Sequence, residues 1–260
     1  MSLVYVYAIA RAGTAPTRLR GLDDAAVRTV AGGDLVAFVS DVAERDYLEE
    51  PLNAHIADME WLTPRAVRHQ EVNAALAAVC DPLVPLAFGT VFRDAARVTR
   101  MLSERAAELG RRFEALRGRS EWIAVVRRDR ARALAAVESE SGPLRALRSE
   151  IEAAPPGRGY LLARRLDETK RTELRASDAA AIVDATEAFE RAQMRLFREP
   201  LVEDAGGGML ARFSVLARRD AGASLDGITA AYAKRWDARG YALELSGPWP
   251  AYRFSTVELA

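Results

Sequence analysis

The stretch VPLAFGTVF, residues 84–92, decides how this chain folds, although none of its side chains can hold a proton, a metal or a phosphate. Its large apolar residues predict a buried strand over residues 83–92, and Gly89 indicates a kink or a close approach of backbone. Burying each large side chain stabilises the fold by roughly 1.5–3 kcal/mol. We therefore interpret the stretch as scaffold, anchoring a central strand, and not as a binding site.

Apolar segments nearer the N-terminus predict further strands. Residues 3–9 are continuously apolar and rich in β-branched and aromatic side chains, which is typical of a strand inside a sheet. Residues 27–30 and 35–39 predict two more strands, joined by a Gly32-Gly33-Asp34 turn whose glycines accept positive φ. We therefore expect an antiparallel hairpin.

One helix precedes the stretch and another follows it. Thr63-Pro64 predicts the start of the first helix, because threonine caps helices and proline fits their first turn. Its apolar positions at helical spacing are His69, Val72, Leu76 and Val79. Asp81-Pro82 predicts its end. After Asp94, a predicted N-cap, apolar residues recur at helical intervals until Gly118.

The second half of the chain alternates strand and helix patterns. The predicted elements are a strand at 121–126, one or two helices over 134–151 broken near Gly142-Pro143, a long helix at 167–199, a glycine turn at 206–208, a strand at 210–216, a helix from Ser224 to Gly240 and a strand at 241–245. This order predicts an α+β protein of two domains, residues 1–118 and 119–260. We expect mixed or antiparallel sheets with ferredoxin-like elements, each covered by helices, and an extended C-terminal tail.

Composition excludes several classes of protein. Acidic and basic side chains number 37 each, so no field of one sign attracts a nucleic acid. The single cysteine, Cys80, forms no internal disulfide and fits a reducing cytoplasm. No segment approaches the ~20 apolar residues that span a bilayer. We expect a cytoplasmic protein that binds neither membrane nor nucleic acid.

Candidate chemical groups are few. His55 and His69 are too far apart for one helical metal face, and no cysteine or carboxylate cluster completes a ligand set. His69 lies on the apolar side of its helix, which favours a hydrogen-bonded structural histidine over a partner contact or catalysis. The glycines at 206–208 precede a strand, whereas a phosphate-binding loop precedes a helix. We expect no catalytic residue, metal or cofactor.

Two features leave a choice open. The long helix carries a narrow apolar seam that includes Phe189 and Leu196, which suits packing on its own sheet or on another protein's helix. The tail, residues 248–254, concentrates prolines and aromatic residues, among them Trp249 and Tyr252, where chain ends are normally polar. The tail either covers the core of its own domain or docks a partner.

Three stretches together resemble one family. They are the His69 helix with residues 83–92, the segment EWIAV at 121–125, and GPWPAYRF at 247–254. Their order and spacing are similar to the gas vesicle protein L/F family (GvpL/GvpF), over almost the whole chain from Val4 to Phe254. Related proteins often carry arginine where Ala87 stands, and proline where Ala251 stands. Because position 87 is alanine and not arginine, the sequence argues against any role that needs a cation in this motif.

The resemblance implies a two-domain α+β protein that takes part in gas vesicle biogenesis. Its implied partners are the small, very hydrophobic major shell subunit and other gas vesicle accessory proteins. The leading hypothesis is a non-catalytic assembly factor, at the gas vesicle or in the cytoplasm, which contacts the shell subunit through Phe189, Leu196, Trp249 and Tyr252. The alternatives are an integral minor protein of the vesicle wall and, more remotely, a small-molecule enzyme that uses His69.

Overall fold

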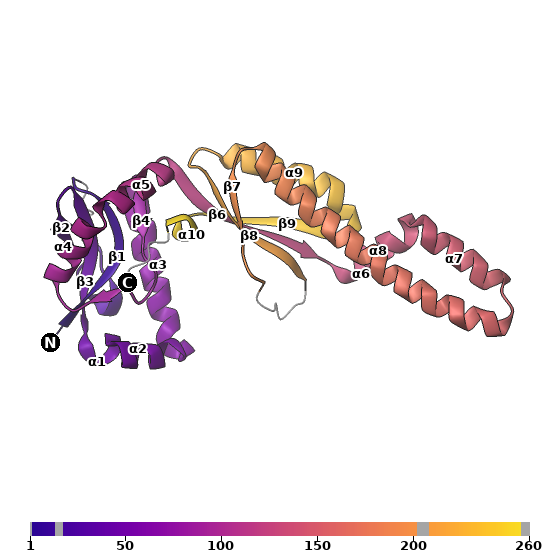
Figure 1. Cartoon of the computed structure of the whole chain (residues 1–260), viewed down its shortest axis with the longest axis horizontal. Coiled ribbons are helices and arrows are strands. Elements are labelled where there is room, and N and C mark those ends of the chain that lie inside the picture. Colours follow the sequence, from indigo (N-terminus) through magenta and orange to yellow (C-terminus); the bar gives the residue numbers. More distant parts are fainter. Residues whose placement is uncertain (1, 14–17, 202–207, 256–260) are drawn as a thin grey trace. The chain divides into compact units, whose positions relative to one another are not determined.

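The computed structural model describes residues 2–13, 18–201 and 208–255, and it divides into two compact units (Figure 1). The first unit runs to Glu121 and also includes the tail from Pro248 onward, and the second is Trp122–Gly247. The predicted division after residue 118 assigned the tail to the second domain. The tail instead groups with the first unit, where the Ser255 hydroxyl donates to the Pro85 carbonyl oxygen at 3.1 Å.

The sheet of the first unit is built around β1 (Ser2–Arg11). β1 pairs antiparallel with β3 (Leu35–Ala43) and, on its other side, with β4 (Leu83–Pro85) and β5 (Val91–Phe92). β2 (Arg28–Gly32) pairs antiparallel with β3 and completes the predicted hairpin. Because residues 3–10 are all buried, a continuously apolar sequence is what this central strand requires.

The opening stretch forms two short strands and not one continuous strand. Residues 86–90 form a turn between β4 and β5, and Gly89 has a φ of 86°, which favours glycine. The N–H of Gly89 donates to the Tyr5 hydroxyl at 3.1 Å. The strand predicted over residues 83–92 is therefore wrong for residues 86–90, whereas the kink predicted at Gly89 is confirmed. The central strand is β1, and the stretch closes one side of it.

Helices surround this sheet. They are η1 (Leu22–Asp24), α1 (Glu44–Tyr47), α2 (Glu49–Ile56), α3 (Met59–Val79), α4 (Ala95–Glu104), α5 (Ala106–Leu116) and, in the tail, α10 (Tyr252–Ser255). α3 begins earlier than predicted, because the Asp58 carboxylate accepts from the backbone N–H groups of Glu60 and Trp61. Asp94 caps α4 as predicted, by accepting from the N–H of Arg97.

The second unit has a four-stranded sheet in the order β7-β8-β6-β9. Its strands are β6 (Arg119–Arg128), β7 (Arg195–Arg198), β8 (Met209–Arg218) and β9 (Tyr241–Trp249). Its helices are α6 (Arg130–Glu140), α7 (Gly142–Ala153), α8 (Pro156–Arg191), α9 (Gly222–Trp236) and η2 (Asp237–Arg239). Figure 1 shows α8 and α9 lying along the sheet, and their buried residues form one core with it.

Two predicted elements in the second half of the chain need correction, the long helix and the tail. The long helix is α8, which starts at Pro156 and ends at Arg191, because Gln193 has a φ of 57° and turns the chain back. Leu196 therefore lies in β7, opposite Val215, and not on the helix. The C-terminal tail is also not extended throughout, since Trp249 ends β9 and α10 follows. Of the predicted glycine turn, residues 206 and 207 lie outside the described residues.

The fold class is confirmed as α+β, with two antiparallel sheets covered by helices. Packing of apolar side chains between each sheet and its helices supplies the core of each unit. None of the helices in the described part of the chain is long and apolar enough to cross a membrane.

Candidate docking groove

The inner face of α3 carries a buried polar network. His69 and Asn73, one helical turn apart, lie on the same face and are 4% and 0% exposed. The Tyr5 hydroxyl lies 2.8 Å from His69 Nδ1, and Asn73 Nδ2 lies 2.9 Å from His69 Nε2. Asn73 Nδ2 also donates to the Tyr252 hydroxyl at 2.9 Å. The network therefore ties the tail and α3 to the central strand.

Burial lowers the pKa of His69 to about 4, because removing the imidazolium from water costs free energy. The side chain is therefore neutral at pH 7, and hydrogen bonds occupy both of its ring nitrogens. His69 lines neither of the two described pockets. Within residues 2–13, 18–201 and 208–255, no group of three or more His, Cys, Asp or Glu side chains is placed to hold a metal ion.

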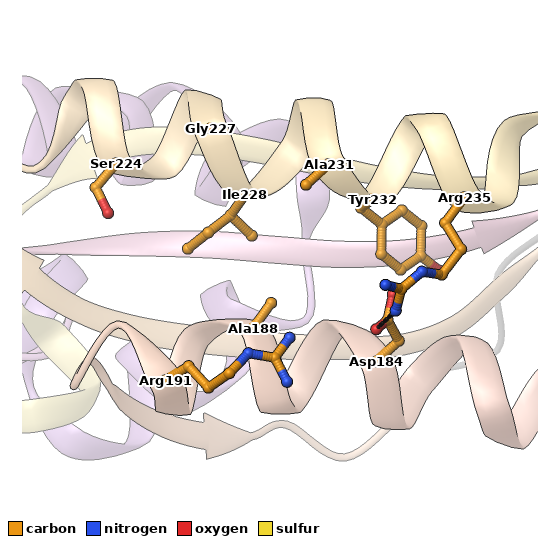
Figure 2. A pocket seen from close by; sticks show the side chains of 9 residues that line it. All are labelled: Asp184, Ala188, Arg191, Ser224, Gly227, Ile228, Ala231, Tyr232 and Arg235. Carbon is orange, nitrogen blue, oxygen red and sulfur yellow. Dashed lines mark hydrogen bonds and ion pairs between the residues drawn. The ribbon is translucent and has the colours of Figure 1, made fainter.

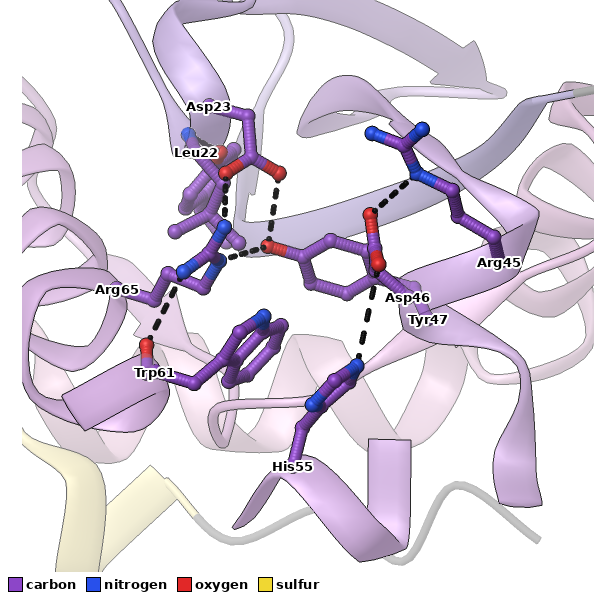
Figure 3. A network of polar contacts seen from close by, with 9 residues as sticks. Leu22, Asp23, Arg45, Asp46, Tyr47, His55, Trp61 and Arg65 are labelled. Carbon is purple, nitrogen blue, oxygen red and sulfur yellow. Dashed lines mark hydrogen bonds and ion pairs between the residues drawn. The ribbon is translucent and has the colours of Figure 1, made fainter. Parts of the chain in front are cut away.

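A second polar network fixes the first half of α3 (Figure 3). The buried Tyr47 hydroxyl donates to Asp23 Oδ2 at 3.1 Å and accepts from Arg65 Nε at 3.2 Å. Arg65 Nη2 also pairs with Asp23 Oδ1 at 2.8 Å, which closes a triangle of contacts. Burial, with a contribution from the Asp23 carboxylate, raises the pKa of Tyr47. Arg65 therefore holds α3 against α1 and η1.

Aromatic stacking joins α2 to the same part of α3. The Arg65 guanidinium lies 4.2 Å from the Trp61 ring centroid, and the His55 ring is stacked on Trp61 at 4.5 Å with an interplanar angle of 8°. His55 Nε2 lies 3.8 Å from Asp46 Oδ1 on α1. Figure 3 shows these side chains converging from α1, α2 and α3. These contacts fix the first half of α3 to η1, α1 and α2, and so they also hold the outer face of α3 in place.

That outer face forms a groove with the end of β9. The residues lining it are Ala66, Val67, Gln70, Glu71, Ala74 and Trp249, and its volume is about 450 Å³. The residues of α3 recur at intervals of three and four, so they form one stripe along the helix. The alanines leave the space that the groove occupies. Val67 is 52% exposed and Trp249 is 39% exposed, so both of these apolar side chains are open to solvent at the groove.

The groove carries little charge. Glu71 is its only ionised side chain, and it pairs with Arg68 at 3.0 Å on the exposed surface. The remaining lining is aliphatic and aromatic apart from the amide of Gln70. An apolar helix face or a large apolar side chain fits such a surface, whereas an ionic substrate gains no partner there.

The four predicted contact residues fall in different surroundings. Trp249 lines the groove, and Tyr252 is half-buried with its hydroxyl accepting from Asn73. Phe189 is fully buried in the core of the second unit, and Leu196 is partly buried against the same core. The apolar seam of α8 therefore packs on its own sheet, which was the first of the two interpretations. Of the four side chains, Trp249 is the one classed as exposed.

Sequence reasoning missed the α3 side of the groove. The signal was a second apolar stripe of small residues, Ala66, Val67 and Ala74, beside the face that carries His69. The apolar spacing of α3 predicts an amphipathic helix with one apolar face, and that pattern assigns this stripe to ordinary surface.

Two helix-covered antiparallel sheets give this chain the fold of two solved gas vesicle proteins. The crystal structure of GvpF from Anabaena sp. PCC7120 matches with a TM-score of 0.76 and 19% identity, covering 99% of this chain and 100% of that one. GvpF from Microcystis aeruginosa matches with a TM-score of 0.70 and 15% identity, covering 98% and 99%. At such identities the likeness shows the fold alone.

The family is shown at the level of sequence. The family model described as gas vesicle synthesis protein GvpL/GvpF matches residues 3–256, so the chain belongs to this family. Gas vesicle protein L of Streptomyces sp. (strain CB03234) is 39% identical over 122 residues. The matched segment spans 46% of each chain, which is less than half the length of that relative. The resemblance seen in the sequence is confirmed.

Proposed function

We propose that this protein is a non-catalytic assembly factor which holds the apolar surface of the major gas vesicle shell subunit in the groove between α3 and Trp249. The observation that carries the proposal is the composition of the groove, an apolar lining of about 450 Å³ that exposes both Val67 and Trp249. Membership of the GvpL/GvpF family supplies the process in which such a surface is needed.

The physical argument concerns the shell subunit before it joins the wall. A small, very hydrophobic subunit exposes apolar surface that aggregates unless another surface covers it. An apolar helix laid into the groove removes such surface from water and contributes about 25 cal/mol for each Å² buried. Because the groove has few hydrogen-bonding groups, the subunit is released without breaking a polar network.

The groove offers a matched pair of positions for a test. Val67 lies in it and Val79 lies outside it, on the same helix, and the two side chains are 52% and 53% exposed. We expect Val67→Glu to abolish recovery of the shell subunit in a co-expression pull-down, because a carboxylate in the groove would be buried unpaired. Val79→Glu should leave recovery unchanged.

Two results would contradict the proposal. One is equal recovery of soluble shell subunit with and without this protein, and the other is equal binding by the Val67→Glu and Val79→Glu variants. The alternative of a minor wall constituent makes a separate prediction. In that case, the protein stays with isolated vesicles after a wash in strong denaturant, whereas a transient assembly factor is removed.

A further inference from the structure

α8 has different surroundings along its length. Figure 2 shows its second half lying against α9, where Asp184 meets Arg235. The first half of α8 packs instead on α7, and Figure 1 shows these two helices projecting beyond the sheet of the second unit. Leu162 is buried in this helical hairpin, but the side chains on the outer face of the same turn of α8 are exposed. The proposed function does not involve this outer face.

The outer face at the start of α8 combines large apolar side chains with positive charge. Tyr160 is 76% exposed and Leu161 is 66% exposed. Arg164 and Arg165 follow them four residues later, so the four side chains form one stripe along the helix. Residues 153–166 contain three arginines and no acidic residue. We call this surface the basic tip, and its members are Arg158, Tyr160, Leu161, Arg164 and Arg165.

Partners within the chain do not neutralise this charge. Arg164 lies 3.6 Å from Glu168, but both side chains are more than half exposed, and an ion pair of this kind contributes little. Neither Arg158 nor Arg165 forms an ion pair with a described residue. Residues 142–166, which span α7 and the start of α8, contain five arginines and two glutamates. This end of the hairpin is therefore net positive.

A surface of the opposite sign lies in the first unit, where α2 leads into α3. Residues 44–60 contain six acidic residues and one arginine. Met59 is 66% exposed, and Ile56, three residues earlier, is 41% exposed. Glu49 and Ile56 are seven residues apart on α2, so they lie on the same side of that helix. We call this surface the acidic corner, and its members are Glu49, Ile56, Met59 and Glu60.

Local roles explain only part of the acidic corner. Glu49 and Glu60 lie in the first turns of α2 and α3, where the helix dipole favours a carboxylate. Neither forms an ion pair with a described residue, so both can pair with a cation from outside the chain. The helix dipole gives no reason for Ile56 and Met59 to be exposed beside them.

The basic tip and the acidic corner share one further property. Among the described residues, the three most exposed large apolar side chains are Tyr160, Leu161 and Met59. Each lies among charges of one sign, although the whole chain has 37 acidic and 37 basic side chains. An apolar centre within a polar rim is the usual anatomy of a protein interface. Since the two rims have opposite signs, each surface complements the other.

We propose that the basic tip of one copy of this protein docks on the acidic corner of a second copy. Tyr160 and Leu161 of one copy cover Ile56 and Met59 of the other, and the arginines of the tip face the carboxylates of the corner. Because two different surfaces meet, each copy keeps a free tip or corner, and the contact continues into a ring or an open row of copies. Surfaces this small give a weak and reversible association.

Sedimentation velocity of the full chain over a range of concentrations tests this proposal. We expect the mean sedimentation coefficient to rise with protein concentration, and the rise to shrink as salt is added. Reversing the tip alone, with Arg164→Glu and Arg165→Glu, should weaken association by more than about tenfold, because charges of like sign then face each other. Reversing the corner alone, with Glu49→Arg and Glu60→Arg, should have the same effect.

A chain that carries all four substitutions separates docking from folding and from net charge. Its net charge equals that of the unsubstituted protein, and its tip and corner again have opposite signs. It should therefore regain association, which a misfolded variant would not.

Matched control variants lie on α8 outside the tip. Arg171→Glu with Arg175→Glu makes the same change of charge at exposed positions further along the helix, and it should alter association by less than about twofold. Leu161→Ser should weaken association severalfold, because it removes apolar surface from the contact. Val183→Ser, at a position that is 52% exposed, should leave association unchanged.

The proposal is overturned if the protein stays monomeric at every concentration, or if the chain with all four substitutions fails to associate. It is also overturned if the Arg171 and Arg175 reversal loses as much association as the tip reversal. A photoreactive amino acid at position 161 identifies what the tip contacts. A crosslink to residues 49–60 of a second copy supports the proposal, whereas crosslinks only within one chain, to another protein or to lipid contradict it. The shell subunit takes no part in this test, so its outcome is independent of the proposed function.

Discussion

The two faces of α3 belong to the same helix, but one is buried within the chain and the other is exposed. On the inner face, His69 and Asn73 are buried and hydrogen-bonded, and Leu76 is 0% exposed beside them. On the outer face, Val67 remains half exposed beside small residues, and Trp249 closes the groove. The difference teaches that the chain itself buries the side chains on one side of the helix. The other side presents apolar surface that another polypeptide can cover.

The largest expected effect is on the inner face. Leu76→Ala should lower the free energy of unfolding by roughly 2–5 kcal/mol, because it opens a cavity beneath the helix. Val79→Ala, on the same helix but 53% exposed, should change it by less than about 0.5 kcal/mol. Urea unfolding of both variants measures the difference. Equal losses would show that the two positions are not distinguished by burial.

The second effect is a dependence on pH that comes from His69. Its pKa falls from 6.5 in the unfolded chain to about 4 in the folded one, so the unfolded state binds the proton more readily. Its contribution is fully present above pH 6.5 and is lost as the pH falls through about 4, a change of about 3 kcal/mol in all. Urea unfolding from pH 7.5 to 4 measures this loss.

A His69→Gln variant isolates this term from the carboxylates that titrate in the same range. Its free energy of unfolding should fall less steeply between pH 6.5 and 4 than that of the unsubstituted protein. Identical slopes would mean that His69 titrates alike in the folded and unfolded states.

A smaller effect is expected where the tail meets the inner face. Tyr252→Phe removes the acceptor of the Asn73 amide hydrogen bond but keeps the ring in place. The free energy of unfolding should fall by about 1 kcal/mol, the usual net contribution of such a bond. Thermal unfolding measures it. An unchanged melting temperature in Tyr252→Phe would remove Asn73 as an anchor of the tail.

The smallest effect on stability belongs to the outer face. Val67→Glu and Val79→Glu should each change the free energy of unfolding by less than about 0.5 kcal/mol, since both positions are exposed. Circular dichroism during heating checks this, and it establishes that any loss of binding in Val67→Glu does not arise from unfolding. A large loss in Val67→Glu alone would show that the groove belongs to the core of the unit.

Strong local signals carried most of the fold prediction. The continuously apolar β1, the Gly33 turn and the Asp94 cap each act through their own residues, so periodicity and turn chemistry locate them. The break in the opening stretch was predictable only in part. Gly89 was recognised as a kink, but its bond to the Tyr5 hydroxyl joins residues far apart in the sequence.

The mispredicted elements depend on contacts between residues far apart in the sequence, which local patterns do not reveal. Leu196 continues the helical spacing of α8, yet the left-handed Gln193 redirects the chain and Leu196 pairs with Val215 in the sheet. Phe189 was correctly placed on the long helix, and its own sheet covers it completely. The groove needed Trp249 beside α3, a proximity that the fold alone provides.

Site-specific photocrosslinking tests the central claim most directly. A photoreactive amino acid placed at position 67, and in a separate sample at position 79, compares two equally exposed sites on one helix. With the shell subunit co-expressed, we predict a crosslinked product from position 67, lost on adding Trp249→Ala, and none from position 79. Equal crosslinking from both positions, or from neither while the complex still forms, would contradict the assignment of the groove.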